Sequence, residues 1–178
     1  MRMNVIGRRQ ILAGAAALAA SPALAQRKGP LARIREETGG RLGLGLLDLG
    51  TGRRYFDGAG ARFAMWSTFK VPLAAAVLDR ADRGQLDLKR EIRFGEADVL
   101  EYAPVVKANL AKGALPIETL LEAAVVMSDN SAANLVFGQI AGPRGLTKFI
   151  REAGDAVTRS DRDEPELNRV RGEDLRDT

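Results

Sequence analysis

The sequence predicts an α+β protein, in which an N-terminal helix and a β-hairpin precede a larger region of helices and one long loop. Its 178 residues are 46% hydrophobic and 5% aromatic, which is typical of a globular protein with an aliphatic core. Two apolar runs flank a Gly-rich turn near residue 50, and from residue 67 onward apolar residues recur at helical spacing. Separate blocks of strands and helices are typical of α+β folds.

A short helix precedes the hairpin. Residues 31–37 have an amphipathic pattern, and residues 42–49 and 53–56 have the pattern of two strands around Gly50-Thr51-Gly52. A two-stranded hairpin is only marginally stable in water and leaves unpaired edges, so it needs further elements beside it. We assign residues 26–66 to this N-terminal part of an α/β region.

The remaining residues, 67–178, predict the helical part. Apolar spacing, with Gly84 after the first helix and Pro116 at the start of the second, predicts helices over 67–83, 116–127, 130–140 and 143–153. The pattern is lost over 159–177, where charges of both signs predict a long surface loop. Loops of that length are usually functional or disordered.

The first 25 residues have the features of an export signal. Arg8-Arg9 precede an apolar run over 11–20, and Ala23-Leu24-Ala25 offers the small residues that a signal peptidase requires, so we expect cleavage after Ala25. The arginine pair favours a twin-arginine signal, and a general secretory signal is the alternative. The apolar run is shorter than the about 20 residues that cross a bilayer, which predicts no stable membrane anchor. We therefore expect export to the periplasm or the medium.

Composition excludes several kinds of chemistry. The chain has no cysteine and no histidine, so disulfides, thiolate catalysis, a Ser-His-Asp triad and a His or Cys zinc site are unavailable within it. The net charge of +4 owes much to the first 25 residues, which hold three arginines and no acidic residue. No basic patch with interleaved aromatic residues is present, and we expect no nucleic-acid partner.

Ser67 and Lys70 form the first candidate pair in Ser67-Thr68-Phe69-Lys70. Residues three apart share a helix face, so the amine can approach the hydroxyl. A lysine withdrawn from water can lose its proton near neutral pH and act as a base on a serine nucleophile. In the alternative interpretation, Ser67 only caps a helix and Lys70 is solvated.

Ser128-Asp129-Asn130 is the second cluster, and it falls between two predicted helices. A second hydroxyl there could pass a proton to a leaving nitrogen, and an Asn side chain could bind an amide carbonyl. The alternative is again a helix start, because Ser, Asp and Asn are all preferred caps.

Glu164-Pro165-Glu166-Leu167-Asn168 is the third cluster, in the charged loop. A carboxylate and an amide four residues apart on a bent segment could hold one water molecule, and a carboxylate that polarises water is what the hydrolysis of an ester requires. The alternative is a solvated turn with Pro165 at the bend.

Taken together, the three clusters resemble those of class A serine β-lactamases, for which the first two are known motifs. The resemblance covers nearly all of the chain after residue 25. It implies the two-part fold that these enzymes share with penicillin-binding proteins, a monomer, a β-lactam substrate and no metal or organic cofactor. Ser67 would then be the nucleophile, and Lys70 would help to activate it.

The resemblance also implies roles for the other residues. Ser128 would relay a proton to the lactam nitrogen, and Asn130 would bind the substrate amide, with Tyr102 at the border of the cleft. Glu164 and Asn168 would hold the hydrolytic water, while the base of the acylation step, Glu164 or Lys70, stays open.

Supporting positions in the loop match as well. Arg162 and Asp177 correspond to an ion pair at the neck of the Ω-loop, which we place at 159–177, and Asn134 to a side chain that ties the loop down near Glu164. The Glu164-Pro165 bond corresponds to one that is cis in the family.

Two rival functions share parts of this pattern. A penicillin-binding D-alanyl-D-alanine peptidase uses the same serine, lysine and triad but releases its acyl group slowly, and Glu164 argues against it. A non-catalytic relic of the fold is the second rival, and the intact motifs argue against that one.

The Lys-Thr-Gly or Lys-Ser-Gly strand that the family carries, with the later strands and the C-terminal helix, does not occur in these 178 residues. The resemblance implies that one of the two N–H donors of the oxyanion hole lies in this missing part. Losing one such donor costs about 100- to 1,000-fold in rate. We therefore expect a purified polypeptide of residues 26–178 to fold poorly and to be inactive. A spectrophotometric assay that found penicillin hydrolysis at an ordinary enzymatic rate would contradict this expectation.

Overall fold

A computed structural model describes residues 30–58, 60–169 and 174–178. The proposed signal peptide, residues 1–25, lies outside the described residues. The chain forms two compact units, Met1–Ala61 and Arg62–Thr178, and each is described by itself.

The first unit contains the predicted helix and hairpin. Helix α2 spans Pro30–Thr38, and strands β1 (Leu44–Leu47) and β2 (Arg54–Asp57) pair antiparallel, with Leu44 opposite Asp57. The Arg35 guanidinium joins helix to hairpin, since it donates to the carbonyl oxygen of Leu42 and to Asp57 Oδ1. All five large apolar side chains of the two strands are exposed: Leu44, Leu46, Leu47, Tyr55 and Phe56.

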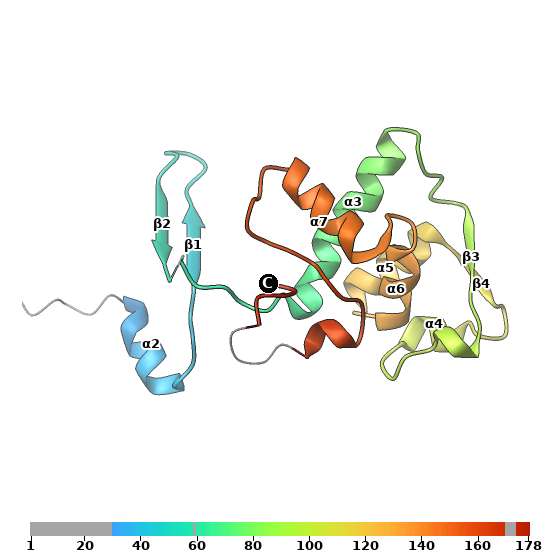
Figure 1. The fold of residues 1–178 in the computed structure, drawn as a ribbon, viewed down its shortest axis with the longest axis horizontal. Coiled ribbons are helices and arrows are strands. Elements are labelled where there is room, and N and C mark those ends of the chain that lie inside the picture. The colour runs from blue at the N-terminus through green and yellow to red at the C-terminus, as the bar shows by residue number, and fades with distance from the viewer. Residues whose placement is uncertain (1–29, 59, 170–173) are drawn as a thin grey trace, which may run out of the picture. The chain divides into compact units, whose positions relative to one another are not determined.

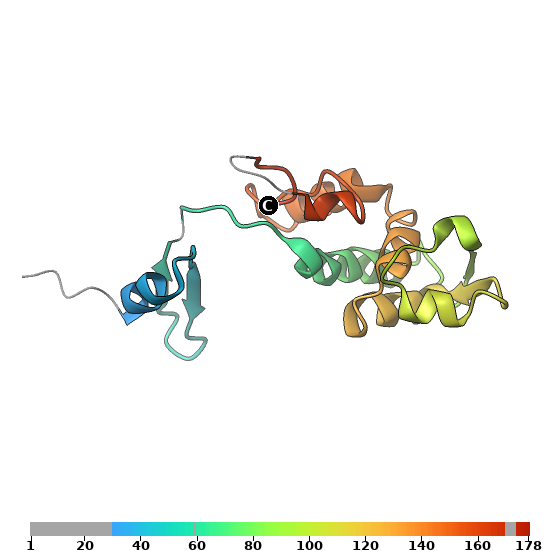
Figure 2. The same cartoon turned by 90° about the horizontal axis from the view of Figure 1, so that it is seen from below.

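The second unit is mainly helical, as predicted, and Figures 1 and 2 show α3 beside α7 and the α5–α6 pair. Its elements are η1 (Trp66–Phe69), α3 (Lys70–Asp82), β3 (Glu91–Arg93), η2 (Glu96–Asp98), α4 (Pro104–Ala108), β4 (Ala114–Pro116), α5 (Ile117–Val126), α6 (Asn130–Phe137), α7 (Gly142–Glu152) and η3 (Glu166–Asn168).

Helix α3 is the centre of this unit because one of its faces is wholly apolar. Phe69, Leu73 and Val77, spaced four residues apart, are at most 1% exposed. The ring of Phe69 stacks on Phe137 of α6 with a centroid distance of 5.2 Å. Side chains from α5, α6 and α7, including Leu120, complete the core around this face.

Several elements differ from the predicted ones in type or extent. The segment predicted as a helix over 67–83 begins as a 3₁₀ turn, and only Lys70–Asp82 is α-helical. Strands β3 and β4 pair antiparallel, and neither they nor α4 was predicted, because three to five residues are too few for a periodic signal. Pro116 both ends β4 and is the N-cap of α5, so this helix begins at Ile117, one residue later than predicted.

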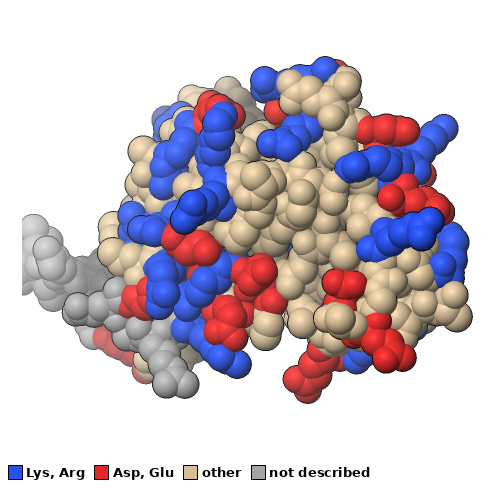
Figure 3. Space-filling view, turned by 45° about the vertical axis from the view of Figure 1, so that its right-hand side comes forward, with Lys and Arg blue, Asp and Glu red and all other residues tan. Residues whose placement is uncertain are grey.

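The described residues of the predicted loop, 159–169 and 174–177, contain one short 3₁₀ turn, η3, and no other helix or strand, as predicted. No described helix is long and apolar enough to cross a membrane. Acidic and basic side chains alternate over the face in Figure 3.

Candidate active site

Ser67 and Lys70 lie on adjoining turns, Ser67 in η1 and Lys70 as the first residue of α3. The Lys70 amine lies 3.4 Å from Ser67 Oγ. Lys70 is only 2% exposed, so the interpretation of a solvated lysine is wrong. Ser67 does not cap α3 either, because the cap position belongs to Phe69.

The backbone before Ser67 makes a tight turn. Trp66 has a φ of 45°, which is rare for a bulky residue, and its side chain is 62% exposed. The carbonyl oxygen of Met65 accepts hydrogen bonds from the backbone N–H (3.0 Å) and the hydroxyl of Thr68. Buried Phe69 fixes the other side of the turn, so Ser67 is held at the start of a well-packed helix.

Ser128 brings a second hydroxyl to the pair. Its backbone is left-handed, with a φ of 55°. The Lys70 amine donates to its carbonyl oxygen at 2.8 Å and to its Oγ at 3.0 Å. Ser128 Oγ lies 3.1 Å from Ser67 Oγ, so the two hydroxyls and the amine form one hydrogen-bonded group.

Asp129, between the two site residues, holds three backbone N–H groups although it is fully buried. Its Oδ1 accepts the N–H of Ala132 and thereby caps α6, while its Oδ2 accepts the N–H groups of Val105 and Val106 at the start of α4. The interpretation of a helix start is therefore correct for Asp129, and it coexists with a site role for its neighbours. Sequence analysis missed the link to α4.

Asn130 contacts the lysine and also lines a neighbouring cavity. Its Oδ1 accepts from the Lys70 amine at 2.6 Å, and its backbone N–H donates to the carbonyl oxygen of Tyr102 at 3.0 Å. The Tyr102 side chain is exposed. A cavity of about 340 Å³ lies beside them, lined by Leu100, Glu101, Tyr102, Asn130 and Pro165.

Glu164, from the Ω-loop, also lies close to the lysine. Its carboxylate is buried, and Oε1 lies 3.6 Å from the Lys70 amine. Asn168 Nδ2 donates to Oε2 at 2.6 Å, whereas Oε1 accepts no hydrogen bond from the described residues. The interpretation of a solvated turn is therefore wrong.

Burial shifts both charged groups toward their neutral forms. It lowers the pKa of the Lys70 ammonium, and the attraction of Glu164 opposes the shift without cancelling it. Burial likewise raises the pKa of the Glu164 carboxyl, against the effects of Lys70 and Asn168. Both groups are thus brought nearer to the range in which a side chain exchanges protons at neutral pH.

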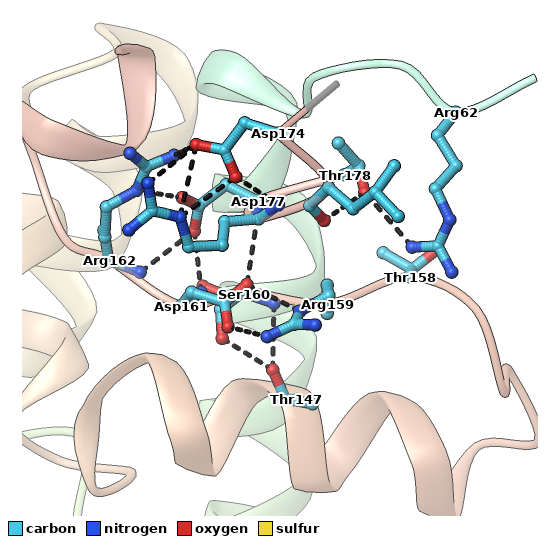
Figure 4. Close-up of polar contacts among 12 residues, drawn as sticks. Arg62, Thr147, Thr158, Arg159, Ser160, Asp161, Arg162, Asp174, Asp177 and Thr178 are labelled. Carbon is cyan, nitrogen blue, oxygen red and sulfur yellow. Dashed lines mark hydrogen bonds and ion pairs between the residues drawn. The ribbon is translucent and has the colours of Figure 1, made fainter. Parts of the chain in front are cut away.

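Two anchors hold the loop that carries Glu164. Asn134 of α6 donates to the carbonyl oxygen of Glu164 at 2.8 Å and accepts its N–H at 3.0 Å. Arg162 Nε donates to Asp177 Oδ2 at 2.6 Å, as Figure 4 shows. The Glu164-Pro165 bond is cis. Both anchors and the cis bond agree with what the resemblance implied.

The structure thus brings together nearly all of the predicted site residues. Ser67, Lys70, Ser128, Asn130, Glu164 and Asn168 form one connected group, with Tyr102 beside it. Among the described residues, no cluster of acidic side chains is suited to a metal ion. Sequence analysis missed the contacts of Asp129 with α4, and also Asp161, which accepts the N–H of Asp177, because short polar side chains bonded to the backbone carry no distinctive spacing.

The profile of the β-lactamase enzyme family matches residues 27–178. The chain belongs to the β-lactamase enzyme family. Among solved structures, it is similar to an ancestral class A β-lactamase, with 46% identity and a TM-score of 0.81 over 84% of this chain and 57% of that one. A β-lactamase from Burkholderia vietnamiensis is 47% identical, with a TM-score of 0.80 over 86% of this chain and 56% of that one.

A reconstructed last common ancestor of Gram-negative β-lactamases of class A is 48% identical, with a TM-score of 0.80, over 83% of this chain and 56% of that one. The fold is therefore that of the class A β-lactamases, as predicted. The chain spans less than two thirds of the length of these solved relatives.

Asp129 provides a test of how the site is supported. Asp129→Ala would leave three N–H groups unpaired in the interior, so we expect it to lower the free energy of unfolding by at least about 3 kcal/mol. Urea denaturation of a chimera, in which residues 27–178 replace the matching part of the ancestral class A enzyme, measures the loss. As a control, the exposed Asp155 accepts two backbone N–H groups in a loop, and Asp155→Ala should cost about 1 kcal/mol or less. Equal losses would contradict the assignment.

Proposed function

We propose that this chain carries the acylation and deacylation residues of a serine β-lactamase that hydrolyses penicillin-type antibiotics. The observation that supports it most is one buried amine, Lys70, that lies near two serine hydroxyls and 3.6 Å from a buried carboxylate, Glu164. Two possible proton acceptors near one serine suit a reaction in which an acyl-enzyme is first made and then hydrolysed.

In the first step, Ser67 Oγ attacks the lactam carbonyl carbon. The Ser67 proton passes to the base, for which the neutral Lys70 amine is favoured by its contact with the hydroxyl and by its lowered pKa. The carbonyl oxygen of Ser128 and Oδ1 of Asn130 accept the two N–H bonds of this neutral amine, which leaves its lone pair for a hydroxyl.

When the lactam C–N bond breaks, the nitrogen needs a proton. Ser128 Oγ lies 3.1 Å from Ser67 Oγ and 3.0 Å from the Lys70 amine, so it can give its proton to the nitrogen and take one from lysine. Asn130 lies at the cleft beside Tyr102, where its side-chain amide can bind the amide group of the substrate. The product of this step is an ester on Ser67.

In the second step, a water molecule attacks the ester. Glu164 Oε1 is the base for this water, because it is buried, faces the lysine and accepts no hydrogen bond from the described residues. Asn168 fixes the other carboxylate oxygen and so orients Oε1. The ester C–O bond breaks, the product leaves as the acid, and Ser67 Oγ takes up the proton that Glu164 removed from the water.

The rival function, a D-alanyl-D-alanine peptidase, needs the serine, the lysine and the second hydroxyl but no buried carboxylate opposite them. Glu164 is only 3% exposed and is hydrogen-bonded to Asn134 and Asn168. Burying a carboxylate costs free energy, which favours a function that uses this group, and the hydrolase does so. A non-catalytic relic would have no need to bury either charge.

A chimera tests the proposal in a complete fold. Residues 27–178 would replace the matching part of the ancestral class A enzyme, and intact-protein mass spectrometry would follow reaction with benzylpenicillin. We expect the chimera to turn over. With Glu164→Gln it should accumulate a penicilloyl adduct on Ser67 that lives about 100- to 10,000-fold longer, because the general base is lost.

Glu166→Gln is the matched control, since Glu166 lies in the same loop but is half-exposed and, among the described residues, forms its ion pair with Arg169. It should behave like the parent. A long-lived adduct in the parent that Glu164→Gln does not alter would indicate the peptidase, and a chimera that never forms an adduct would contradict both enzymatic functions.

A further inference from the structure

The neck of the Ω-loop, residues 159–162 and 174–178, contains a reciprocal pair of hydrogen bonds beyond the Arg162–Asp177 ion pair. Asp177 Oδ1 accepts the N–H of Asp161 at 2.7 Å, and Asp161 Oδ2 accepts the N–H of Asp177 at 3.1 Å. The N–H of Arg162 also donates to Asp177 Oδ1, at 2.9 Å. The carboxylate on each side of the neck therefore accepts a backbone N–H from the opposite side (Figure 4).

Asp177 needs this support because its backbone is left-handed, with a φ of 54°. Non-glycine residues adopt this conformation infrequently, and it persists where the surroundings hold it. The Asp177 side chain is almost fully buried, and both its N–H and its carboxylate bond to the opposite side of the neck. Asp161 is the acceptor for the N–H, so it fixes the residue at its backbone.

The carbonyl oxygen of Asp177 connects the neck of the Ω-loop to the turn before Ser67. It accepts the N–H of Met65 at 2.8 Å, and Met65 lies two residues before Ser67. The carbonyl oxygen of Met65 in turn accepts the N–H and the hydroxyl of Thr68, the residue after Ser67. The turn that presents Ser67 is thus bonded to Asp177 at its first residue.

From these contacts we propose that Asp161 is a positioning residue of the reaction: its carboxylate holds Asp177, whose carbonyl oxygen holds the Met65 turn from which Ser67 projects. The neck would then position the nucleophile Ser67. It would also position Glu164, which lies two residues after Arg162 in the same loop. The catalytic part of this inference rests on the proposed function.

The charges of the neck allow two carboxylates to lie together. Three arginines (Arg159, Arg162 and Arg176) face three aspartates (Asp161, Asp174 and Asp177). Burial raises the pKa of the Asp161 carboxyl, but the Arg159 guanidinium, the Asp177 backbone and Arg162 outweigh it, so the pKa lies below its ordinary value. Asp161 is therefore an ionised acceptor at neutral pH.

Amide hydrogen exchange in the chimera, which supplies a complete fold, tests the mechanical link without any catalysis. Asp161→Ala should speed exchange of the Met65 and Asp177 amides at least about tenfold, because the restraint on Asp177 is lost. Exchange in α5 should stay unchanged, which separates a local effect from unfolding. Asp161→Asn keeps an oxygen that can accept the Asp177 N–H and should restore most of the protection.

Arg159→Gln is the matched control. It removes the exposed ion-pair partner of Asp161 but leaves the Asp161 carboxylate in place. The exchange rate of the Met65 amide should therefore change by less than about threefold. A Met65 amide that exchanges equally fast in the parent and in Asp161→Ala, or that responds as strongly to Arg159→Gln, would overturn the link. A parent chimera without protection at Met65 would overturn it as well.

The same variants in the chimera test the effect on chemistry. Asp161→Ala should slow acylation of Ser67 by benzylpenicillin about tenfold, and Asp161→Asn by less than about threefold. Unchanged acylation in Asp161→Ala would contradict the positioning role. A parent chimera that is never acylated would contradict the proposed function instead, and the exchange measurement would still decide whether the neck restrains the Met65 turn.

Discussion

A lysine ammonium is costly to remove from water, and the second unit of this protein is arranged around one that is 2% exposed. Lys70 is the first residue of the central helix α3, and three oxygens of Ser128 and Asn130 lie within 3.0 Å of its amine. The Glu164 carboxylate supplies the opposite charge at 3.6 Å. These neighbours meet the hydrogen-bonding demand of the amine, while burial still favours its neutral form.

Each segment that supplies a partner to Lys70 is fixed to the helical core by its own anchor. Asp129 binds the Ser128 turn to α6 and α4, and Asn134 binds the Glu164 segment to α6. Asp177 binds the base of the Ω-loop to the turn before Ser67. The reacting side chains come from segments far apart in sequence, and short buried polar contacts with the backbone determine how they meet.

The predictable part of the structure is the part with a repeating signal. Helices α3, α5, α6 and α7 and the hairpin follow from apolar spacing and turn residues, whereas β3, β4 and α4 are too short to produce one. The site residues were found because three motifs share one chemistry, and each motif alone also fits a cap or a turn. For Asp129 both interpretations hold, because one carboxylate can cap a helix and support a site.

Other features depend on tertiary contacts that no local pattern contains. The burial of Lys70 and Glu164 needs two segments more than 90 residues apart to meet. The Asp161–Asp177 pair closes a loop through backbone N–H groups, which every residue except proline possesses. The left-handed backbone at Trp66 and Ser128 is likewise set by its surroundings, since neither residue type favours it.

Burial makes Lys70 a weaker base than an ordinary lysine, and Glu164 partly opposes this effect. NMR titration of the Lys70 side chain in the chimera, labelled with ¹³C at the ε-carbon, measures its pKa directly. We predict a pKa below the ordinary value of about 10.4 and a further decrease in Glu164→Gln, where the opposing carboxylate is gone. A pKa at or above the ordinary value, or an increase in Glu164→Gln, would contradict this effect of burial.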